Sequence, residues 1–94
     1  MGNCSRRQPR TAVIWQVELS DDYQTTWLDY EGHWYQLLES AYQYTRSRPW
    51  MCHMVELENL EWGTIDYEVD LRFMVQIQPR TGTQRRVRRL VVEV

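Results

Sequence analysis

The chain contains no lysine, and all eleven of its basic residues are arginines. An arginine guanidinium grips phosphate or carboxylate in two-pronged fashion, which the point charge of a lysine does not. The arginines are also concentrated: residues 72–89 contain six of them and no acid, whereas residues 18–70 contain twelve of the thirteen acids and two arginines. For the basic segment, binding to an anionic partner and a solvated surface are about equally well supported.

Several other features are scarce. Two cysteines, Cys4 and Cys52, are too few for a disulfide framework and fit an intracellular compartment, cytoplasm or nucleus. No apolar run approaches the length of a membrane span. The sequence has no Ser/His/Asp set and no phosphate-binding glycine loop, and Cys52-His53 lacks the spacing of a zinc site. We therefore expect no catalytic activity, no metal and no cofactor.

The first residues form a separate segment. Residues 1–10 are predicted to be a disordered basic tail that precedes a single domain over residues 11–94. The tail begins Met-Gly-Asn-Cys, which offers Gly2 for myristate and Cys4 for palmitate. The lipidation pattern requires a hydroxyl residue where Arg6 stands, so membrane attachment is the minor alternative.

Ninety-four residues suit one small domain, and five tryptophans and six tyrosines are many for this length. Runs rich in β-branched and aromatic residues predict strands, and in some of them apolar and polar residues clearly alternate. A stripe of apolar residues at helical spacing predicts one helix. The predicted elements are strands over residues 11–19 and 25–28, a helix over 33–44, and strands over 50–57, 64–70, 74–79 and 83–92. Gly82 marks a tight turn between the last two strands. This order indicates an α+β fold.

Five sequence blocks, taken in order, are similar to the blocks of a WWE domain, the small module named for two tryptophans and a glutamate. The blocks are Trp15–Glu18, Trp27–Tyr30, Leu38–Tyr42, Tyr67–Gln76 and Thr81–Arg89, and the match covers roughly residues 11–90. The resemblance implies a strongly curved, half-open antiparallel sheet wrapped around one helix, with a short turn at Asp70 to Phe73. It also assigns structural roles to Trp15, Glu18, Trp27 and Tyr30, with both tryptophans expected in the core.

The resemblance also implies a binding site. Family members occur beside ubiquitin-ligase and ADP-ribosyltransferase domains, and several bind ADP-ribose or the iso-ADP-ribose unit of poly(ADP-ribose). Carried over by position, Tyr67 is similar to the aromatic residue at the adenine, Gln76 to the pocket amide and Arg85 to the phosphate contact. Adenine offers a face for stacking and a polar edge for an amide, and arginine matches phosphate in charge and shape.

One position departs from the family pattern. Where the best poly(ADP-ribose) binders carry a stacking aromatic, this chain has Val17, which we expect to weaken binding. Trp34, Tyr35 and Trp62 are candidates to replace the missing ring. Arg88 is the candidate for an auxiliary phosphate contact.

Each site residue has a structural alternative, and so does the function. Tyr67 is also suited to a half-buried place in a sheet, and Arg85 is also suited to an ion pair with Asp70 or Glu68. The first functional hypothesis is recognition of an ADP-ribose-containing ligand by a module that links ADP-ribosylation to ubiquitination. The second is a protein-interaction module with a vestigial pocket. Single-stranded nucleic acid is the third, and the acidic body of the chain argues against it.

Overall fold

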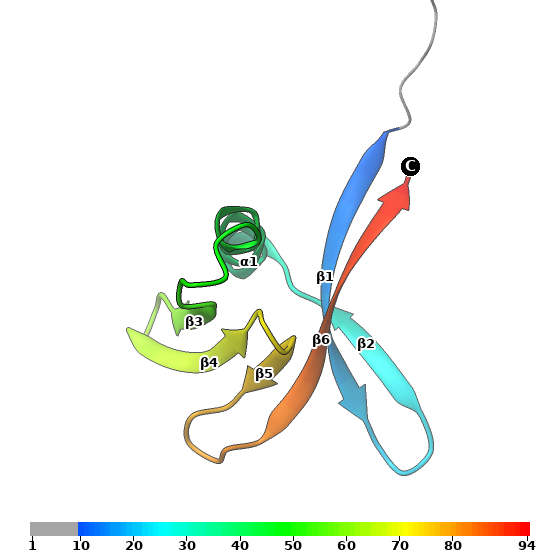
Figure 1. Ribbon diagram of the computed structural model, residues 1–94. Coiled ribbons are helices and arrows are strands. Elements are labelled where there is room, and N and C mark those ends of the chain that lie inside the picture. Colours follow the sequence, from blue (N-terminus) through cyan, green and yellow to red (C-terminus); the bar gives the residue numbers. More distant parts are fainter. Residues whose placement is uncertain (1–9) are drawn as a thin grey trace, which may run out of the picture.

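The computed structural model describes residues 10–94, so the predicted tail up to residue 9, with Gly2 and Cys4, lies outside the described residues. Within residues 10–94, six strands and one helix confirm the predicted α+β class (Figure 1). The elements are β1 (Thr11–Ser20), β2 (Thr25–Asp29), α1 (Gly32–Thr45), β3 (Met54–Asn59), β4 (Thr64–Asp70), β5 (Val75–Ile77) and β6 (Gln84–Glu93). No helix in this part of the chain is long and apolar enough to cross a membrane.

The six strands form one antiparallel sheet in the order β2-β1-β6-β5-β4-β3. The sheet is not closed into a barrel, because β2 and β3 remain as its two edges. The long strands β1 and β6 lie side by side, with Thr11 opposite Glu93. The sheet curves around α1, as the resemblance implied (Figure 1).

The core lies between the concave face of the sheet and one side of α1. Its fully buried side chains come from four different elements and are Trp15, Leu38, Leu57 and Val69. Tyr30, Leu71 and Val87 complete the buried cluster. Because alternate residues of a strand point to opposite faces, the strand residues of this cluster come from one face of the sheet. Trp15 and Tyr30, for which the resemblance implied structural roles, are both buried.

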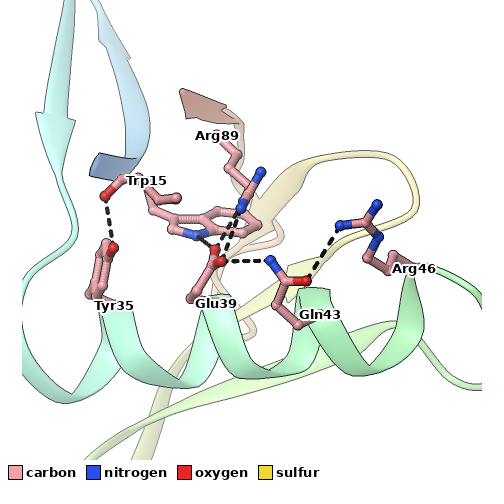
Figure 2. Close-up of polar contacts among 7 residues, drawn as sticks. Trp15, Tyr35, Glu39, Gln43, Arg46 and Arg89 are labelled. Carbon is pink, nitrogen blue, oxygen red and sulfur yellow. Dashed lines mark hydrogen bonds and ion pairs between the residues drawn. The ribbon is translucent and has the colours of Figure 1, made fainter. Parts of the chain in front are cut away.

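Glu39 joins the helix to the centre of the sheet (Figure 2). Its Oε1 accepts hydrogen bonds from Trp15 Nε1 at 2.8 Å and from Arg89 Nε at 2.9 Å. Its Oε2 accepts from Arg89 Nη2 and from Gln43 Nε2, both at 2.9 Å. Trp15 and Arg89 are opposite each other on β1 and β6, so one carboxylate bridges two central strands and α1.

The strand predicted over residues 50–57 begins only at Met54. Met54 lies opposite Asp70, where β4 ends, so the four residues before Met54 have no partner strand. The Arg72 guanidinium also donates to the carbonyl of Pro49 at 2.9 Å, which holds this segment as a loop. The prediction of a strand over residues 50–53 was wrong, because a high β-strand propensity does not by itself supply a neighbouring strand to pair with.

Trp27, predicted as a core residue, lies half-buried on the convex face instead. It is opposite Glu18, and residues directly opposite in a sheet share a face. The Arg88 guanidinium lies 4.0 Å from the centre of the Trp27 ring, and the Arg86 guanidinium lies 5.9 Å from it. Glu18 forms an ion pair with Arg86.

The closing hairpin is shorter on its first strand than predicted. β5 covers Val75–Ile77, not residues 74–79, because the turn to β6 already begins at Gln78. The Gly82 N–H donates to the Gln78 carbonyl at 2.8 Å, and Gly82 has a φ of 74°. A glycine adopts this left-handed conformation without a steric penalty, which confirms the predicted tight turn.

Candidate functional site

A four-residue turn, Leu71–Met74, brings two of the predicted site residues onto one face of the sheet. The Asp70 carboxylate stabilises this turn by accepting hydrogen bonds from two of its backbone N–H groups, at 2.9 and 3.3 Å. After the turn, Gln76 pairs opposite Val69. Tyr67 precedes Val69 by two residues, so Tyr67 and Gln76 share a face although a continuous strand would separate them.

The third predicted site residue comes from the neighbouring strand. Arg85 on β6 is directly opposite Gln76 on β5, and β4 with Tyr67 flanks β5 on its other side. All three side chains line one cavity of about 370 Å³. This volume lies within the range typical of small-molecule sites. The structure thus brings together the residues predicted from positions far apart in the sequence.

Gln76 is buried at the base of this cavity, with 6% of its surface exposed. Its Oε1 accepts a hydrogen bond of 2.5 Å from the Tyr30 hydroxyl. Burial raises the pKa of Tyr30, so the phenol stays protonated and acts as the donor. The amide Nε2 of Gln76 has no hydrogen-bond partner within residues 10–94. That N–H₂ group is therefore the part of Gln76 available to a ligand.

Two aromatic rings form another wall. Tyr67 and Trp34 pack edge to face, with ring centroids 5.8 Å apart and an interplanar angle of 87°. Trp34 Nε1 donates to the Glu58 carbonyl at 2.9 Å, which fixes the indole. Of the three aromatics considered as substitutes for the missing ring, Trp34 lines the cavity, whereas Tyr35 and Trp62 do not.

One part of the lining is aliphatic. Val17 on β1 lies opposite Leu28 on β2, and both line the cavity with Leu19. These side chains offer an apolar surface but no π-face. The position at which the family pattern calls for a ring therefore borders the cavity and carries valine.

The arginines differ in their partners. Arg85 makes no hydrogen bond or ion pair within the described part of the chain, so the predicted alternative pairing with Asp70 or Glu68 is not formed there. Arg88 lies outside the cavity, where its Nε donates to Gln16 Oε1 at 2.7 Å. Of these two candidates for phosphate, the structure places only Arg85 at the cavity.

Other lining residues were not predicted from the sequence. They are Leu19, Leu28, Asp29, Glu31, Gln78 and Thr83. Gln78 follows Gln76 by two residues, and this spacing was the available signal, since it places both amides on one face of an extended segment. The leucines, the two acids and Thr83 carry no comparable signal, because their approach to the cavity depends on the curvature of the sheet.

Replacing Tyr30 with phenylalanine tests whether the Tyr30 hydroxyl stabilises the buried Gln76 side chain. The variant keeps the ring but leaves the buried Gln76 oxygen without its donor, which is expected to lower the free energy of unfolding by about 1–3 kcal/mol. Urea denaturation measures this change. Tyr23→Phe is the control. Because Tyr23 is 95% exposed, this substitution is expected to leave the free energy of unfolding nearly unchanged. Equal stability of the two variants would contradict the role of the Tyr30 hydroxyl.

Comparison with known proteins agrees with the resemblance in the sequence. The family model of the WWE domain matches residues 13–89 of the chain. This range runs from β1 to β6 and contains every lining residue of the cavity. No curated protein matches the chain.

Proposed function

Because the chain belongs to the WWE domain family, we propose that its cavity binds ADP-ribose or the iso-ADP-ribose unit of poly(ADP-ribose). WWE domains are non-catalytic recognition modules for protein interaction or ADP-ribose binding. The observation that carries the proposal is the convergence of Tyr67, Gln76 and Arg85 on one cavity. Within residues 10–94 the Arg85 guanidinium and the Gln76 amide nitrogen have no protein partner.

Each of these groups matches one part of such a ligand. Tyr67 and Trp34 offer aromatic surface to the adenine, and the Gln76 N–H₂ offers hydrogen-bond donors to its polar edge. Arg85 offers a guanidinium to a phosphate, and a hydrogen bond to a charged group contributes about 1.5–3 kcal/mol. The aliphatic side chains around Val17 offer apolar surface to the sugar and base.

Calorimetric titration of the domain with ADP-ribose and with iso-ADP-ribose tests the proposal. Gln76→Ala and Arg85→Ala are expected to abolish the heat of binding, because they remove the amide and the guanidinium from the cavity. Arg86→Ala is the matched control, since Arg86 stands next to Arg85 but its side chain is 71% exposed and pairs with Glu18. No heat from a folded wild-type domain would reject ADP-ribose as the ligand and favour a protein partner.

Val17→Tyr is expected to tighten binding. The substitution places a ring in the wall where the family pattern has a stacking residue. One base–aromatic stack is worth about 1–3 kcal/mol, which corresponds to a roughly ten- to hundredfold lower dissociation constant. The same titration measures this gain, and Val17→Leu separates the effect of a ring from that of added bulk. Equal affinities of the tyrosine and leucine variants would show that stacking is not the limiting contact.

In the cell, the proposed role is to bring a ubiquitin ligase or an ADP-ribosyltransferase to ADP-ribosylated targets. The module would be part of such an enzyme or act with it, and would thereby link ADP-ribosylation to ubiquitination. Nucleic acid is a poor candidate partner, because four of the six arginines in residues 72–89 already bind protein groups. These four are Arg72, Arg86, Arg88 and Arg89.

The second candidate function is binding of a protein partner. A separate cavity of about 330 Å³ lies beside the loop before β3 and is lined by Trp50, Met54 and Phe73, among others. Trp50 is 78% exposed and Phe73 is 73% exposed. Exposed aromatic residues of this kind are enriched at protein interfaces. This surface contains none of the residues predicted to contact ADP-ribose, so both functions are compatible with one fold.

A further inference from the structure

A second cavity adjoins the first. It has a volume of about 300 Å³ and shares two lining residues, Tyr67 and Gln78, with the first cavity. Tyr67 and Gln78 therefore form a common wall between the two.

The second cavity contains a cation with no protein partner. Arg80, in the turn between β5 and β6, is exposed and forms no hydrogen bond or ion pair within the described residues. Arg85, which is half-buried at the first cavity, likewise forms no hydrogen bond or ion pair within the described residues. The two adjoining cavities thus present two guanidiniums that have no partner among the described residues, one in each cavity.

The second cavity also contains a carboxylate held in a fixed position. Asp66 Oδ1 accepts a hydrogen bond from Thr64 at 3.1 Å, and Asp66 Oδ2 accepts one from Asn59 at 3.4 Å. Each oxygen retains a further lone pair that accepts from a hydroxyl group. A carboxylate disfavours phosphate directly beside it, so the chemistry near Asp66 selects a sugar hydroxyl, while Arg80 selects a phosphate.

We propose that this second cavity is a subsite for the next sugar–phosphate group of an oligomeric ligand. The inference rests on the proposed binding of ADP-ribose in the first cavity and adds a preference for chains over single units. Tyr67 and Gln78 lie between the units, Asp66 accepts from a sugar hydroxyl, and Arg80 binds a phosphate of the following unit. A single ADP-ribose placed in the first cavity leaves the second cavity empty.

The test compares ADP-ribose with a linear dimer of ADP-ribose units, both titrated into the wild-type chain and into Arg80→Gln. This variant is expected to weaken binding of the dimer about tenfold, because it removes one charge-assisted contact. Binding of ADP-ribose should be unchanged. Arg46→Gln removes the same charge from a site at the end of α1 that lines neither cavity, so it should leave both affinities unchanged.

The outcomes separate the two proposals. A selective loss of dimer affinity in Arg80→Gln supports the second subsite, and circular dichroism confirms that the variant is folded. If ADP-ribose binds and depends on Arg85, but Arg80→Gln changes both affinities equally or neither, the subsite is rejected and the proposed function stands. If the folded wild-type chain binds neither ligand, both proposals are rejected.

Discussion

Replacing Trp15 with alanine is expected to lower the free energy of unfolding by about 3–5 kcal/mol, the range for deleting a large aromatic side chain from a core. Trp15 is fully buried and packs edge-on against Tyr42, with ring centroids 5.8 Å apart. Its indole N–H also donates to Glu39, so the substitution both opens a cavity and removes a hydrogen bond. Domains of this size are stable by only about 5–15 kcal/mol, so this loss is a large fraction of the total and the variant should unfold at a much lower urea concentration than the wild type.

Trp50→Ala is the matched control for this experiment. Trp50 is 78% exposed, so the same chemical change should alter the stability by no more than about 0.5 kcal/mol. Urea unfolding followed by far-ultraviolet circular dichroism measures both variants without depending on tryptophan fluorescence. Similar midpoints for the two variants would contradict the central place assigned to Trp15.

The second large effect is expected at Glu39 under acid conditions. Hydrogen bonds from Arg89 lower the pKa of this carboxyl from its ordinary value of 4.5 to about 2, and Gln43 and Trp15 donate further bonds. The folded state therefore binds fewer protons at this site than the unfolded state. The stabilising contribution of Glu39 is fully present above about pH 4.5 and is lost as the pH falls toward 2.

Glu39→Gln should remove this dependence. The variant is expected to be less stable at neutral pH by about 1–3 kcal/mol, because a neutral amide cannot accept all the hydrogen bonds from Trp15 and Arg89. Its stability should then fall less steeply than that of the wild type between pH 4.5 and 2. Urea midpoints across this pH range measure the difference. If the stability of the two proteins falls equally between pH 4.5 and 2, another carboxylate is responsible for the loss of stability in acid.

The substitutions at Trp15 and Glu39 affect residues that stabilise the fold but do not line the cavity. Trp15, Glu39 and Arg89 hold α1 against β1 and β6, but none of them lines the candidate site (Figure 2). Variants of this network should lose affinity only as they unfold. Variants of Gln76 or Arg85, in contrast, should lose affinity while folded, and combining stability with binding measurements distinguishes the two classes.

The sequence by itself determined the class of fold and the order of its elements. Alternation predicted the strands around residues 11–19 and 64–70, helical spacing predicted α1, and Gly82 predicted the final turn. These features are local, because side-chain period and glycine conformation depend on neighbouring residues. The blocks from Trp15 to Arg89 further identified the family that the comparison shows. The concentration of arginine without lysine pointed to recognition of an anionic group.

The tertiary structure alone decided which side chains have partners. Arg85 and Arg88 both stand on β6, yet Arg85 faces the cavity while Arg88 covers Trp27 on the convex face. The residue type is identical, so composition does not separate them. The physical reason is the pairing register: Arg85 is set opposite Gln76, and Arg88 opposite Gln16. Register and curvature arise from contacts between strands distant in sequence, and they also bring Arg80 to a cavity that adjoins the first.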